Sequence, residues 1–360
     1  MRVALVHEFL IQMGGAEKAL RNFHEIFPKA PVFTLFYDKE RTDGIFEGWD
    51  IRTSRLQRLK NRYKWFLPLM PRAIESFDLS GYDVVLSDAS AFAKGVITKK
   101  PTVHVCYCHT PTRYIWEDAA GYVNSLPYPR IVKLLAKHYL NFNLKKWDYR
   151  AAQRPDYMIA NSKTVQARIK KYYDRASTVI YPPVDTDFYK PTGARQDYFL
   201  TGSRLEPYKK IDLVVQAFNE LKLSLKVVGT GTELERLKNM AKSNIDFVGR
   251  VSDQELRKLY GGAQAFVFPA VEDAGLMVLE ALSCGTPVIG LNMGGTAEFV
   301  GDGENGILFQ NQTVDDIVAA VRRFRSENFK ADVLCRSALP YDRAVFKKKI
   351  TDFVNHAAAK

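Results

Sequence analysis

Two glutamates, Glu272 and Glu280, stand eight positions apart and frame a helix start. Glu272 follows a strand-like run, which places it in a loop at the carboxyl edge of a predicted sheet. Gly275, Leu276 and Met277 open the next helix and are expected to contact a substrate, because glycine lets backbone N–H groups approach a ligand. Glu280 lies two turns later and can accept hydrogen bonds from paired hydroxyls, as in a ribose. A solvated helix face is the alternative.

A second group of candidate residues is basic. Another predicted strand ends at Gly202, and Arg204, Lys209 and Lys210 follow it. Arginine offers a fork of donors and lysine a point charge, so together they suit a diphosphate. A basic surface loop is the alternative interpretation.

Two glycine pairs stand at predicted helix starts. Gly14 and Gly15 precede Ala16, and Gly294 and Gly295 precede Thr296. Glycines there let backbone N–H groups approach an anion at the positive end of the helix dipole. The first pair does not form the G-x-G-x-x-G dinucleotide pattern, and a tight turn would explain it as well.

Histidine and carboxylate side chains also follow predicted strands. His109 is a candidate catalytic residue, although a core or capping histidine would give the same pattern. Asp88 faces the same sheet edge by position, but it fits a helix cap equally well. His7 and Glu8 lie at a strand end and receive no assignment.

Metal ligands are not indicated. Cys106 and Cys108 precede His109, but no second ligand cluster stands at zinc spacing elsewhere in the chain. These two cysteines are expected to be strand thiols, and we assign no metal and no cofactor.

The candidate residues are joined by an alternation of strand-like and helical stretches. Alternation of this kind predicts parallel sheets with helices on both faces and a ligand crevice beyond the carboxyl ends of the strands. We therefore predict an α/β chain of two Rossmann-like, doubly wound domains that face each other across a cleft. The predicted strands are 3–6, 32–35, 83–87, 103–107, 157–161, the run 179–185 that two prolines stop, 198–202, 225–229, 245–249, 265–269 and 287–290, with helices notably at 130–152 and 212–218.

The domain boundary is placed by two prolines. Pro182 and Pro183 stop the last strand-like run of the first half. We predict one domain over 1–185, a second over 186–340, and a separate C-terminal segment over 341–360.

Charge is distributed unevenly along the 360 residues, whose formal net charge is +12. Residues 1–185 contain 29 Lys and Arg against 18 Asp and Glu, while residues 186–360 contain 23 against 22. A positive half indicates an anionic partner such as nucleic acid, a membrane surface or a phosphorylated substrate. No apolar run is long enough to span a bilayer or to act as a secretory signal, and four cysteines fit a reducing cytosol, so we expect a cytoplasmic protein.

The segment Ile51–Ile74 contains seven basic residues and no acidic one. Apolar side chains recur in it near helical spacing, including Leu56, Tyr63 and Phe66. A basic amphipathic helix with aromatic residues is typical of the interface of an anionic membrane. An ordinary helix packed on its own domain is the alternative.

Together these motifs resemble glycosyltransferase family 4, the retaining nucleotide-sugar transferases of the GT-B fold. The resemblance covers essentially the whole chain and rests on Gly14–Glu17, Gly202–Leu205 with Lys209, the span from Glu272 to Glu280, and Gly294–Gly295. Ser76–Asp83, Ala93–Gly95 and Cys106–Tyr114 look like bacterial O-antigen and exopolysaccharide mannosyltransferases. Family members carry a bulky aromatic where Ala274 stands, which leaves the identity of the donor sugar open.

The resemblance implies an acceptor-binding domain over 1–185, a nucleotide-sugar-binding domain over 186–340, and a C-terminal helix over 341–360 that crosses back to the first domain. It also implies a role for each candidate residue. Glu272 would hold hydroxyls of the donor sugar, Glu280 would hold the ribose, and His109 would face the donor sugar. Arg204 and Lys209 would meet the leaving diphosphate, together with amides near Gly15 and Gly295, without a metal ion.

The implied reaction is transfer of a sugar, in the first place mannose from GDP-mannose, to a lipid-linked saccharide in bacterial cell-surface polysaccharide synthesis. The enzyme would work on the inner face of the plasma membrane. A UDP-sugar donor and a soluble acceptor stay open as alternatives. A nucleic-acid-binding protein is disfavoured because no recognition helix or RNA-binding motif is present, and an NAD enzyme because the dinucleotide fingerprint is missing.

Overall fold

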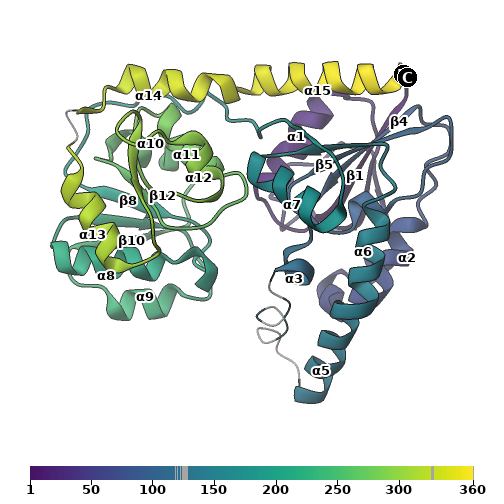
Figure 1. Ribbon diagram of the computed structural model, residues 1–360, viewed down its shortest axis with the longest axis horizontal. Helices are drawn as coiled ribbons and strands as arrows, with labels where there is room; N and C mark the ends of the chain where they lie inside the picture. Colours follow the sequence, from purple (N-terminus) through teal and green to yellow (C-terminus); the bar gives the residue numbers. More distant parts are fainter. Residues whose placement is uncertain (118, 120, 122, 124–128, 326–327, 360) are drawn as a thin grey trace. The chain divides into compact units, whose positions relative to one another are not determined.

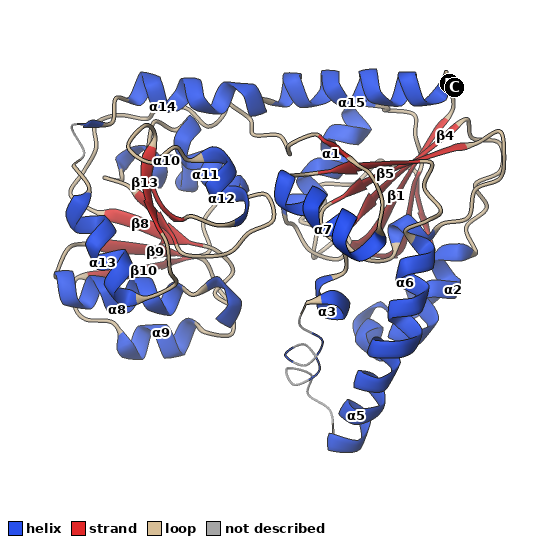
Figure 2. Cartoon of the chain, viewed as in Figure 1, coloured by secondary structure: helices blue, strands red, loops and turns tan. Residues whose placement is uncertain are grey.

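The computed structural model describes residues 1–117, 119, 121, 123, 129–325 and 328–359. The chain divides into two compact units. The N-terminal unit contains Met1–Tyr181 and Phe346–Lys360, and the C-terminal unit contains Pro182–Val345. The division falls at the proline pair, slightly before the position 185 expected from the sequence. Each unit is a parallel sheet covered by helices (Figures 1 and 2).

The sheet of the N-terminal unit has seven strands in the order β3-β2-β1-β4-β5-β6-β7, all paired in parallel. The chain builds outwards from β1 to β3, then returns and builds the other half from β4. The strands are β1 (Val3–Leu10), β2 (Val32–Tyr37), β3 (Ile51–Thr53), β4 (Val84–Ala89), β5 (Val103–Cys108), β6 (Tyr157–Ala160) and β7 (Thr178–Val179).

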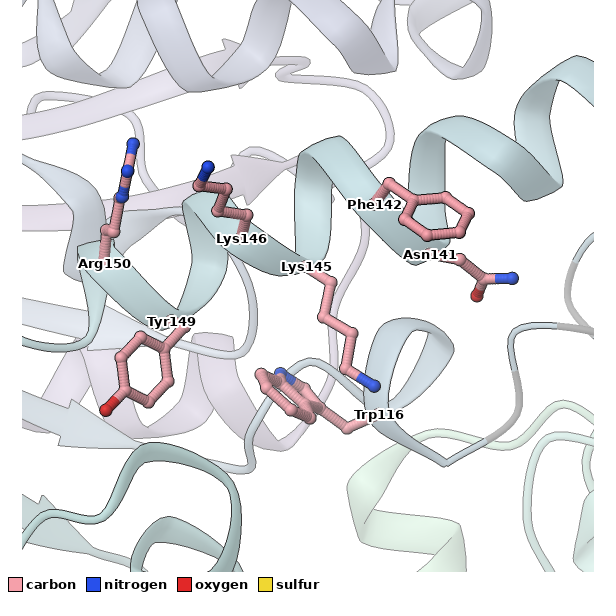
Figure 3. A pocket seen from close by; sticks show the side chains of 7 residues that line it. All are labelled: Trp116, Asn141, Phe142, Lys145, Lys146, Tyr149 and Arg150. Carbon is pink, nitrogen blue, oxygen red and sulfur yellow. The ribbon is translucent and has the colours of Figure 1, made fainter.

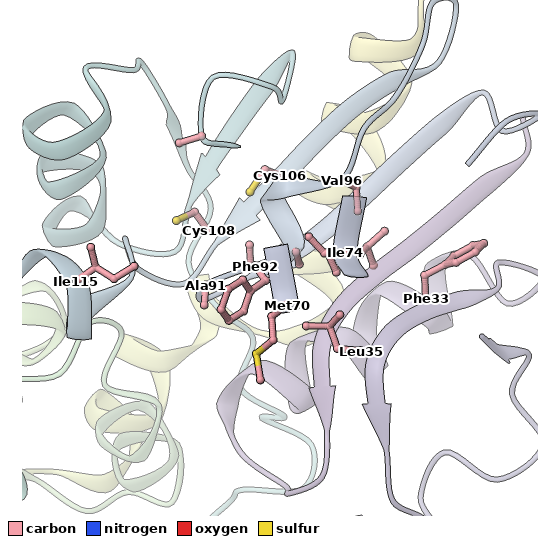
Figure 4. Packing of buried hydrophobic residues seen from close by; sticks show 14 of the residues in the cluster. Phe33, Leu35, Met70, Ile74, Ala91, Phe92, Val96, Cys106, Cys108 and Ile115 are labelled. Carbon is pink, nitrogen blue, oxygen red and sulfur yellow. The ribbon is translucent and has the colours of Figure 1, made fainter. Parts of the chain in front are cut away.

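The central strands are buried on both faces, which explains their nearly continuous apolar sequences. In β1, Ala4 and Val6 belong to the hydrophobic cluster on one face, and Val3 and Leu5 to the cluster on the other. Figure 4 shows part of the first cluster, in which Phe33, Leu35 and other sheet residues pack against helices and loops.

Short helices cover this sheet. The helices that the chain forms between β1 and β7 are α1 (Gly15–Ile26), η1 (Arg55–Leu69), α2 (Met70–Glu75), η2 (Ala93–Gly95), α3 (Arg113–Trp116), α5 (Arg130–Tyr139), η3 (Leu140–Leu144), α6 (Lys145–Ala151) and α7 (Lys163–Tyr173). The predicted helix at 130–152 is thus confirmed as α5, a π-helical turn at η3, and α6.

The basic segment 51–74 differs from the predicted membrane-facing helix. It forms edge strand β3, the 3₁₀ helix η1 and the start of α2. Its apolar side chains Leu56, Tyr63 and Leu67 pack against the core of the N-terminal unit, and Met70 and Ile74 are buried in it. These contacts support the alternative interpretation for this side of the segment, whereas Trp65 and Leu69 are exposed.

The C-terminal unit repeats the plan with six strands in the order β10-β9-β8-β11-β12-β13. Its strands are β8 (Phe199–Gly202), β9 (Leu225–Val228), β10 (Ile245–Gly249), β11 (Phe266–Phe268), β12 (Val288–Leu291) and β13 (Gly306–Phe309). Its helices are η4 (Pro207–Lys209), α8 (Ile211–Leu221), α9 (Leu234–Met240), α10 (Asp253–Gly262), α11 (Leu276–Ser283), α12 (Gly294–Phe299), α13 (Val314–Arg323), α14 (Ala331–Ala338) and η6 (Leu339–Tyr341).

The last helix, α15 (Arg343–Ala358), belongs almost entirely to the N-terminal unit. Phe346, Ile350, Val354 and Ala357 are buried in the cluster on the α1 face of the sheet. The Phe346 ring lies 5.6 Å from that of Phe23 and 5.8 Å from that of Tyr107. The end of the chain is therefore part of the N-terminal core.

Each sheet has one point where the strand order reverses. In the N-terminal unit it lies between β1 and β4, and in the C-terminal unit between β8 and β11. Ligands of open α/β sheets bind beyond the carboxyl ends of the strands at such points. Among the described residues, no helix is long and apolar enough to cross a membrane.

Candidate functional site

The switch point of the N-terminal unit carries a chain of buried polar side chains. His7 on β1 pairs in register with Asp88 on β4, and His109 follows the end of β5. Asp88 accepts a hydrogen bond from His7 Nδ1 at 2.8 Å and one from His109 Nε2 at 2.5 Å. His7 Nε2 lies 3.8 Å from Glu17 Oε1. The parallel register thus links the three strand ends to the first turn of α1.

The protonation of this chain follows from its partners. Burial favours neutral His7, but hydrogen bonds to Asp88 and Glu17 outweigh that cost and raise the pKa of His7 well above 6.5. Burial also opposes charge on His109, yet the Asp88 carboxylate raises the pKa of His109. For Asp88 the two imidazoles outweigh burial and lower the pKa. The geometry favours an ionised carboxylate between protonated imidazoles.

His109 is the member of this chain with some access to solvent, since its side chain is 13% exposed and those of His7 and Asp88 are 3% and 1% exposed. Asp88 engages Nε2 of this ring. The core-histidine alternative therefore fits His7 better than His109. The sequence placed all three at strand ends, but only the register brings them together.

The N-terminus of α1 lies next to this chain of buried polar side chains. Gly14 is the N-cap of α1 in an extended conformation, and Gly15 is the first helical residue. A Cβ on Gly14 would lie 3.1 Å from Glu17 Oε2, so glycine leaves room for that carboxylate. The two predicted binding glycines thus stand next to the buried chain.

A neighbouring loop is fixed by Glu8. Its Oε1 atom accepts hydrogen bonds from the backbone N–H groups of Ser90, Ala91 and Ala93 at 2.8, 2.6 and 3.1 Å. Glu8 also contributes to the raised pKa of His109. This residue received no assignment from the sequence, and its role here is to hold the loop after β4.

Lys94 in the same loop forms a buried ion pair. Its Nζ atom lies 2.6 Å from Asp148 Oδ1 on α6. Asp148 also accepts hydrogen bonds from Thr112, Trp116 and Tyr173. Burial opposes the charge on Lys94, but Asp148 outweighs it and raises the pKa of Lys94. The pair ties α6 to the rim of the switch point.

At the switch point of the C-terminal unit, Lys209 and Glu272 form an ion pair. Lys209 ends η4 after β8, and Glu272 lies in the loop after β11. Their side chains are 11% and 25% exposed. The sequence assigned them to different parts of one substrate, and the structure places them together.

The other predicted cations of this loop are exposed. Arg204 Nη2 lies 3.4 Å from the Tyr208 hydroxyl, and the Lys209 ammonium lies 5.0 Å from the Tyr208 ring centroid. Lys210 adopts a left-handed conformation with φ 56° at the start of α8. Three basic side chains thus gather within seven residues, two of them open to solvent.

The glycines near α12 allow two loops to touch. The Gly295 N–H donates to the Glu272 carbonyl at 2.8 Å, and Cβ atoms on Gly294 or Gly295 would collide with the backbone at Glu272 and Ala274. Gly275 has φ +57° and precedes α11. The N–H of Gly295 is therefore used inside the protein, which differs from the expected diphosphate contact for that group.

Glu280 lies deeper than the sequence suggested. It is only 4% exposed on α11, and its Oε2 atom lies 3.4 Å from the Tyr260 hydroxyl of α10. Leu276 and Met277 in the first turn of α11 are partly exposed. The helix thus presents its first turn to the loop of Glu272, with Glu280 behind it.

Metal-binding side chains do not cluster within the described ranges. No group of three or more His, Cys, Asp or Glu residues that could hold a metal ion is found within them, and the four cysteines are free thiols. The sequence contains one Asp-x-Asp triplet, at residues 185–187. Asp185 there accepts a hydrogen bond from Arg343 at 2.6 Å and one from the Phe188 N–H at 3.0 Å.

Two family models together match residues 13–337 of the chain. The model described as Glycosyltransferase Family 4 matches residues 13–188, and the one described as Glycosyl transferases group 1 matches residues 186–337. The junction of the two matches falls close to the boundary between the two units.

One curated relative comes from Mycolicibacterium smegmatis. It is named GDP-mannose-dependent alpha-(1-6)-phosphatidylinositol monomannoside mannosyltransferase and is 32% identical over 170 residues, which are 39% of this chain and 44% of that protein. The chain spans about half the length of the curated relatives that it matches.

Solved structures match over nearly the whole chain. Anabaena HepE in complex with UDP-glucose has a TM-score of 0.74 at 17% identity and covers 99% of this chain and 100% of its own. Sucrose-phosphate synthase of Thermosynechococcus elongatus has a TM-score of 0.75 at 16% identity, with 99% of each chain covered. These similarities confirm the predicted fold, the two-domain α/β architecture known as GT-B.

Proposed function

The chain belongs to glycosyltransferase family 4, and on this premise we propose that it transfers a hexose from a nucleoside diphosphate sugar to a lipid-linked saccharide with retention of configuration. The Lys209–Glu272 pair at the switch point of the C-terminal unit is the observation that carries the proposal. It joins a cation suited to a diphosphate with a carboxylate suited to sugar hydroxyls.

The pair has a direct function in donor binding. Without a ligand, Lys209 and Glu272 neutralise each other in a partly buried site. A bound diphosphate competes for the Lys209 ammonium, and Glu272 is then able to accept hydrogen bonds from the sugar. Arg204 and Lys210, which are exposed nearby, add positive charge for the phosphates.

The reaction exchanges one C1–O bond for another. The bond between C1 of the sugar and the β-phosphate oxygen breaks, and C1 bonds to the acceptor hydroxyl oxygen on the same face of the ring. The acceptor proton passes to the leaving diphosphate. Negative charge grows on that diphosphate in the transition state, where Lys209 and Arg204 stabilise it. We propose that these side chains make a metal ion unnecessary.

His109 is proposed to contact the donor through Nδ1. Asp88 holds the opposite nitrogen and raises the pKa of His109, so the ring keeps both protons to a higher pH than a free imidazole does. An imidazolium can donate a hydrogen bond to a sugar hydroxyl or a phosphate oxygen. Asp88 is then a positioning residue, because it acts through His109.

We propose GDP-mannose as the donor, because the mycobacterial relative is named for that substrate. A UDP-sugar is the second candidate, named in the complex of Anabaena HepE, which shares the fold. A small residue, Ala274, stands beside Glu272 and leaves room around the donor sugar.

The acceptor is proposed to be lipid-linked, in synthesis of a bacterial cell-surface polysaccharide. The same relative is named for a phosphatidylinositol mannoside acceptor. The net charge of +12 supports an encounter with an anionic surface, and the proposed place of work is the cytoplasmic face of the membrane.

A donor screen tests the proposal. Release of nucleoside diphosphate is measured for GDP-mannose, GDP-glucose, UDP-glucose and UDP-galactose, with and without a lipid-linked acceptor. GDP-mannose is expected to be consumed fastest, and Glu272→Gln is expected to slow turnover without loss of GDP binding. Turnover of none of these sugars would overturn the proposal, while a UDP-sugar preference would replace only the donor.

A further inference from the structure

Helices α5 and α6, joined by η3, form an arm of the N-terminal unit that runs from Arg130 to Ala151. In Figure 1, α5 extends beyond α6 and away from the sheet of that unit. The root of the arm is firmly held. Asp148 pairs with buried Lys94, and the Trp147 Nε1–H donates to Glu75 at 2.7 Å.

One side of the arm packs on its own domain. Leu140 and Leu144 are buried in the core of the N-terminal unit, and Tyr139 packs against it. This side satisfies the ordinary need of an amphipathic helix for a buried apolar face.

The opposite side of the arm is apolar as well, yet it faces solvent. Ile131, Leu134, Leu135 and Phe142 are 74%, 68%, 66% and 64% exposed. They recur at intervals of three, one and seven residues, which places them on one face of the helix. Single exposed apolar residues are ordinary on protein surfaces, but a contiguous apolar stripe marks an interaction surface.

The charges beside this stripe have one sign. Arg130, Lys133, Lys137, Lys145 and Lys146 lie in the arm, and the sequence has no Asp or Glu between residues 119 and 147. The one carboxylate of the arm, Asp148, is buried and paired with Lys94. The exposed face of the arm is therefore cationic as well as apolar.

At the root of the arm the same face becomes aromatic and basic. A shallow groove is lined by Trp116, Asn141, Phe142, Lys145, Lys146, Tyr149 and Arg150. Figure 3 shows Lys145 directed towards Trp116, and its ammonium lies 4.6 Å from the ring centroid. Trp and Tyr side chains favour the headgroup level of a bilayer, and basic grooves bind phosphate headgroups.

We propose that this face of the arm, rather than the segment 51–74, docks the protein on an anionic lipid bilayer. The apolar stripe enters the interface, and the neighbouring lysines and arginines contact the lipid phosphates. A second copy of the chain is disfavoured as occupant, because two such cationic faces would repel each other. The inference rests on the proposed function only in that a lipid-linked acceptor makes a membrane position useful.

Vesicle co-sedimentation with matched variants tests the proposal. Leu134→Ser with Leu135→Ser removes apolar contacts, and binding to phosphatidylglycerol-containing vesicles is expected to fall about tenfold for each leucine. Arg130→Gln with Lys137→Gln removes two exposed charges, with an expected loss of about fivefold each. The second loss should be confined to anionic vesicles and should vanish at high salt.

The control variants lie in the segment that the sequence alone favoured. Arg55→Gln with Arg58→Gln and Leu69→Ser change exposed residues of η1 and are expected to leave vesicle binding unchanged. Equal losses from these controls, or unchanged binding of the leucine variant, would overturn the proposal. If the leucine variant instead has a lower oligomer mass than the wild type in sedimentation velocity and binds vesicles equally well, the face is a self-association surface and the proposal is overturned.

Donor turnover separates this inference from the proposed function. Every arm variant is expected to keep wild-type turnover with a water-soluble acceptor analogue. Vesicle binding that depends on the arm, in a protein that turns over no nucleotide sugar, would overturn the proposed function and leave the docking surface intact. Turnover of a nucleotide sugar without vesicle binding would overturn the docking surface and leave the proposed function intact.

Discussion

At the switch point of the N-terminal unit the charged side chains are buried and bonded to one another, whereas at that of the C-terminal unit they lie at or near the surface. His7 and Asp88 are almost fully enclosed, and Lys209 and Glu272 are partly open. The interaction between two buried charges is strong, but neither charge can change its partner without leaving the other buried and unpaired. Partly exposed charges can exchange one partner for a ligand. The first arrangement suits a preorganised contact, and the second suits binding and release of a diphosphate.

The largest effect is expected at the cations of the C-terminal switch point. Lys209→Ala removes a positive charge from the leaving diphosphate, and turnover should fall by about 30- to 1,000-fold, equal to about 2–4 kcal/mol. Arg204→Ala should act in the same direction. Steady-state kinetics with the preferred donor measure both, and Lys258→Ala, an exposed lysine of α10, is the control. Wild-type turnover in both variants would refute the diphosphate role.

The buried chain is tested next by Asp88→Asn. One charged hydrogen-bond partner of His109 is lost, so turnover at neutral pH should fall by about 10- to 100-fold. The pH profile gives the sharper test. Burial lowers the pKa of His109, and Asp88 is the largest influence that raises it, ahead of Glu8. Loss of the Asp88 charge therefore lowers that pKa, and the basic limb of kcat/KM should move to lower pH.

The control for that experiment is Asp83→Asn, which changes an exposed carboxylate just before β4. Its pH profile should match that of the wild type. A basic limb that stays in place in Asp88→Asn would show that His109 does not depend on this carboxylate.

Smaller effects are expected from the two glutamates, one on turnover and the other on nucleotide affinity. Glu272→Gln should lower turnover about tenfold and leave nucleotide affinity similar, because its proposed contact is the sugar. Glu280→Gln should weaken binding of the bare nucleotide about tenfold. Because Glu280 is buried near Tyr260, the thermal unfolding of this variant must be measured as a control. Calorimetric titration with GDP distinguishes them, and equal losses of affinity would contradict the division.

The smallest effect is expected from a chelator. The two switch points supply their own cations, so EDTA should leave turnover unchanged within error. Loss of activity that Mg²⁺ or Mn²⁺ restores would break the comparison, because a metal ion would then carry part of the charge assigned to Lys209 and Arg204.

Local patterns in the sequence were sufficient to predict the two sheets. Apolar β-branched runs such as those of β1 and β4 signal strands buried on both faces, and their alternation with helices specifies parallel sheets. Two short strands were not predicted. β3 has three residues and an exposed arginine, and β13 follows a glycine-rich turn, so neither gives a strong periodic signal.

The candidate site was predictable residue by residue but not as an arrangement. The sequence placed His7, Asp88 and His109 at strand ends, yet Asp88 fitted a helix cap equally well, His109 had a core or capping alternative, and His7 received no assignment. Only the parallel register sets His7 beside Asp88 and both beside His109. In the C-terminal unit the sequence likewise could not show that Lys209 and Glu272 pair, since more than sixty positions separate them.

The two basic amphipathic segments show where sequence reasoning ends. Residues 51–74 and 130–151 both combine helical spacing of apolar residues with lysine and arginine. In the first, Leu56, Tyr63 and Leu67 pack against the sheet, and in the second, Leu134 and Leu135 face solvent. Periodicity along a chain determines that a helix has an apolar face. What covers that face depends on residues distant in sequence, so only the tertiary structure decided which segment stays exposed.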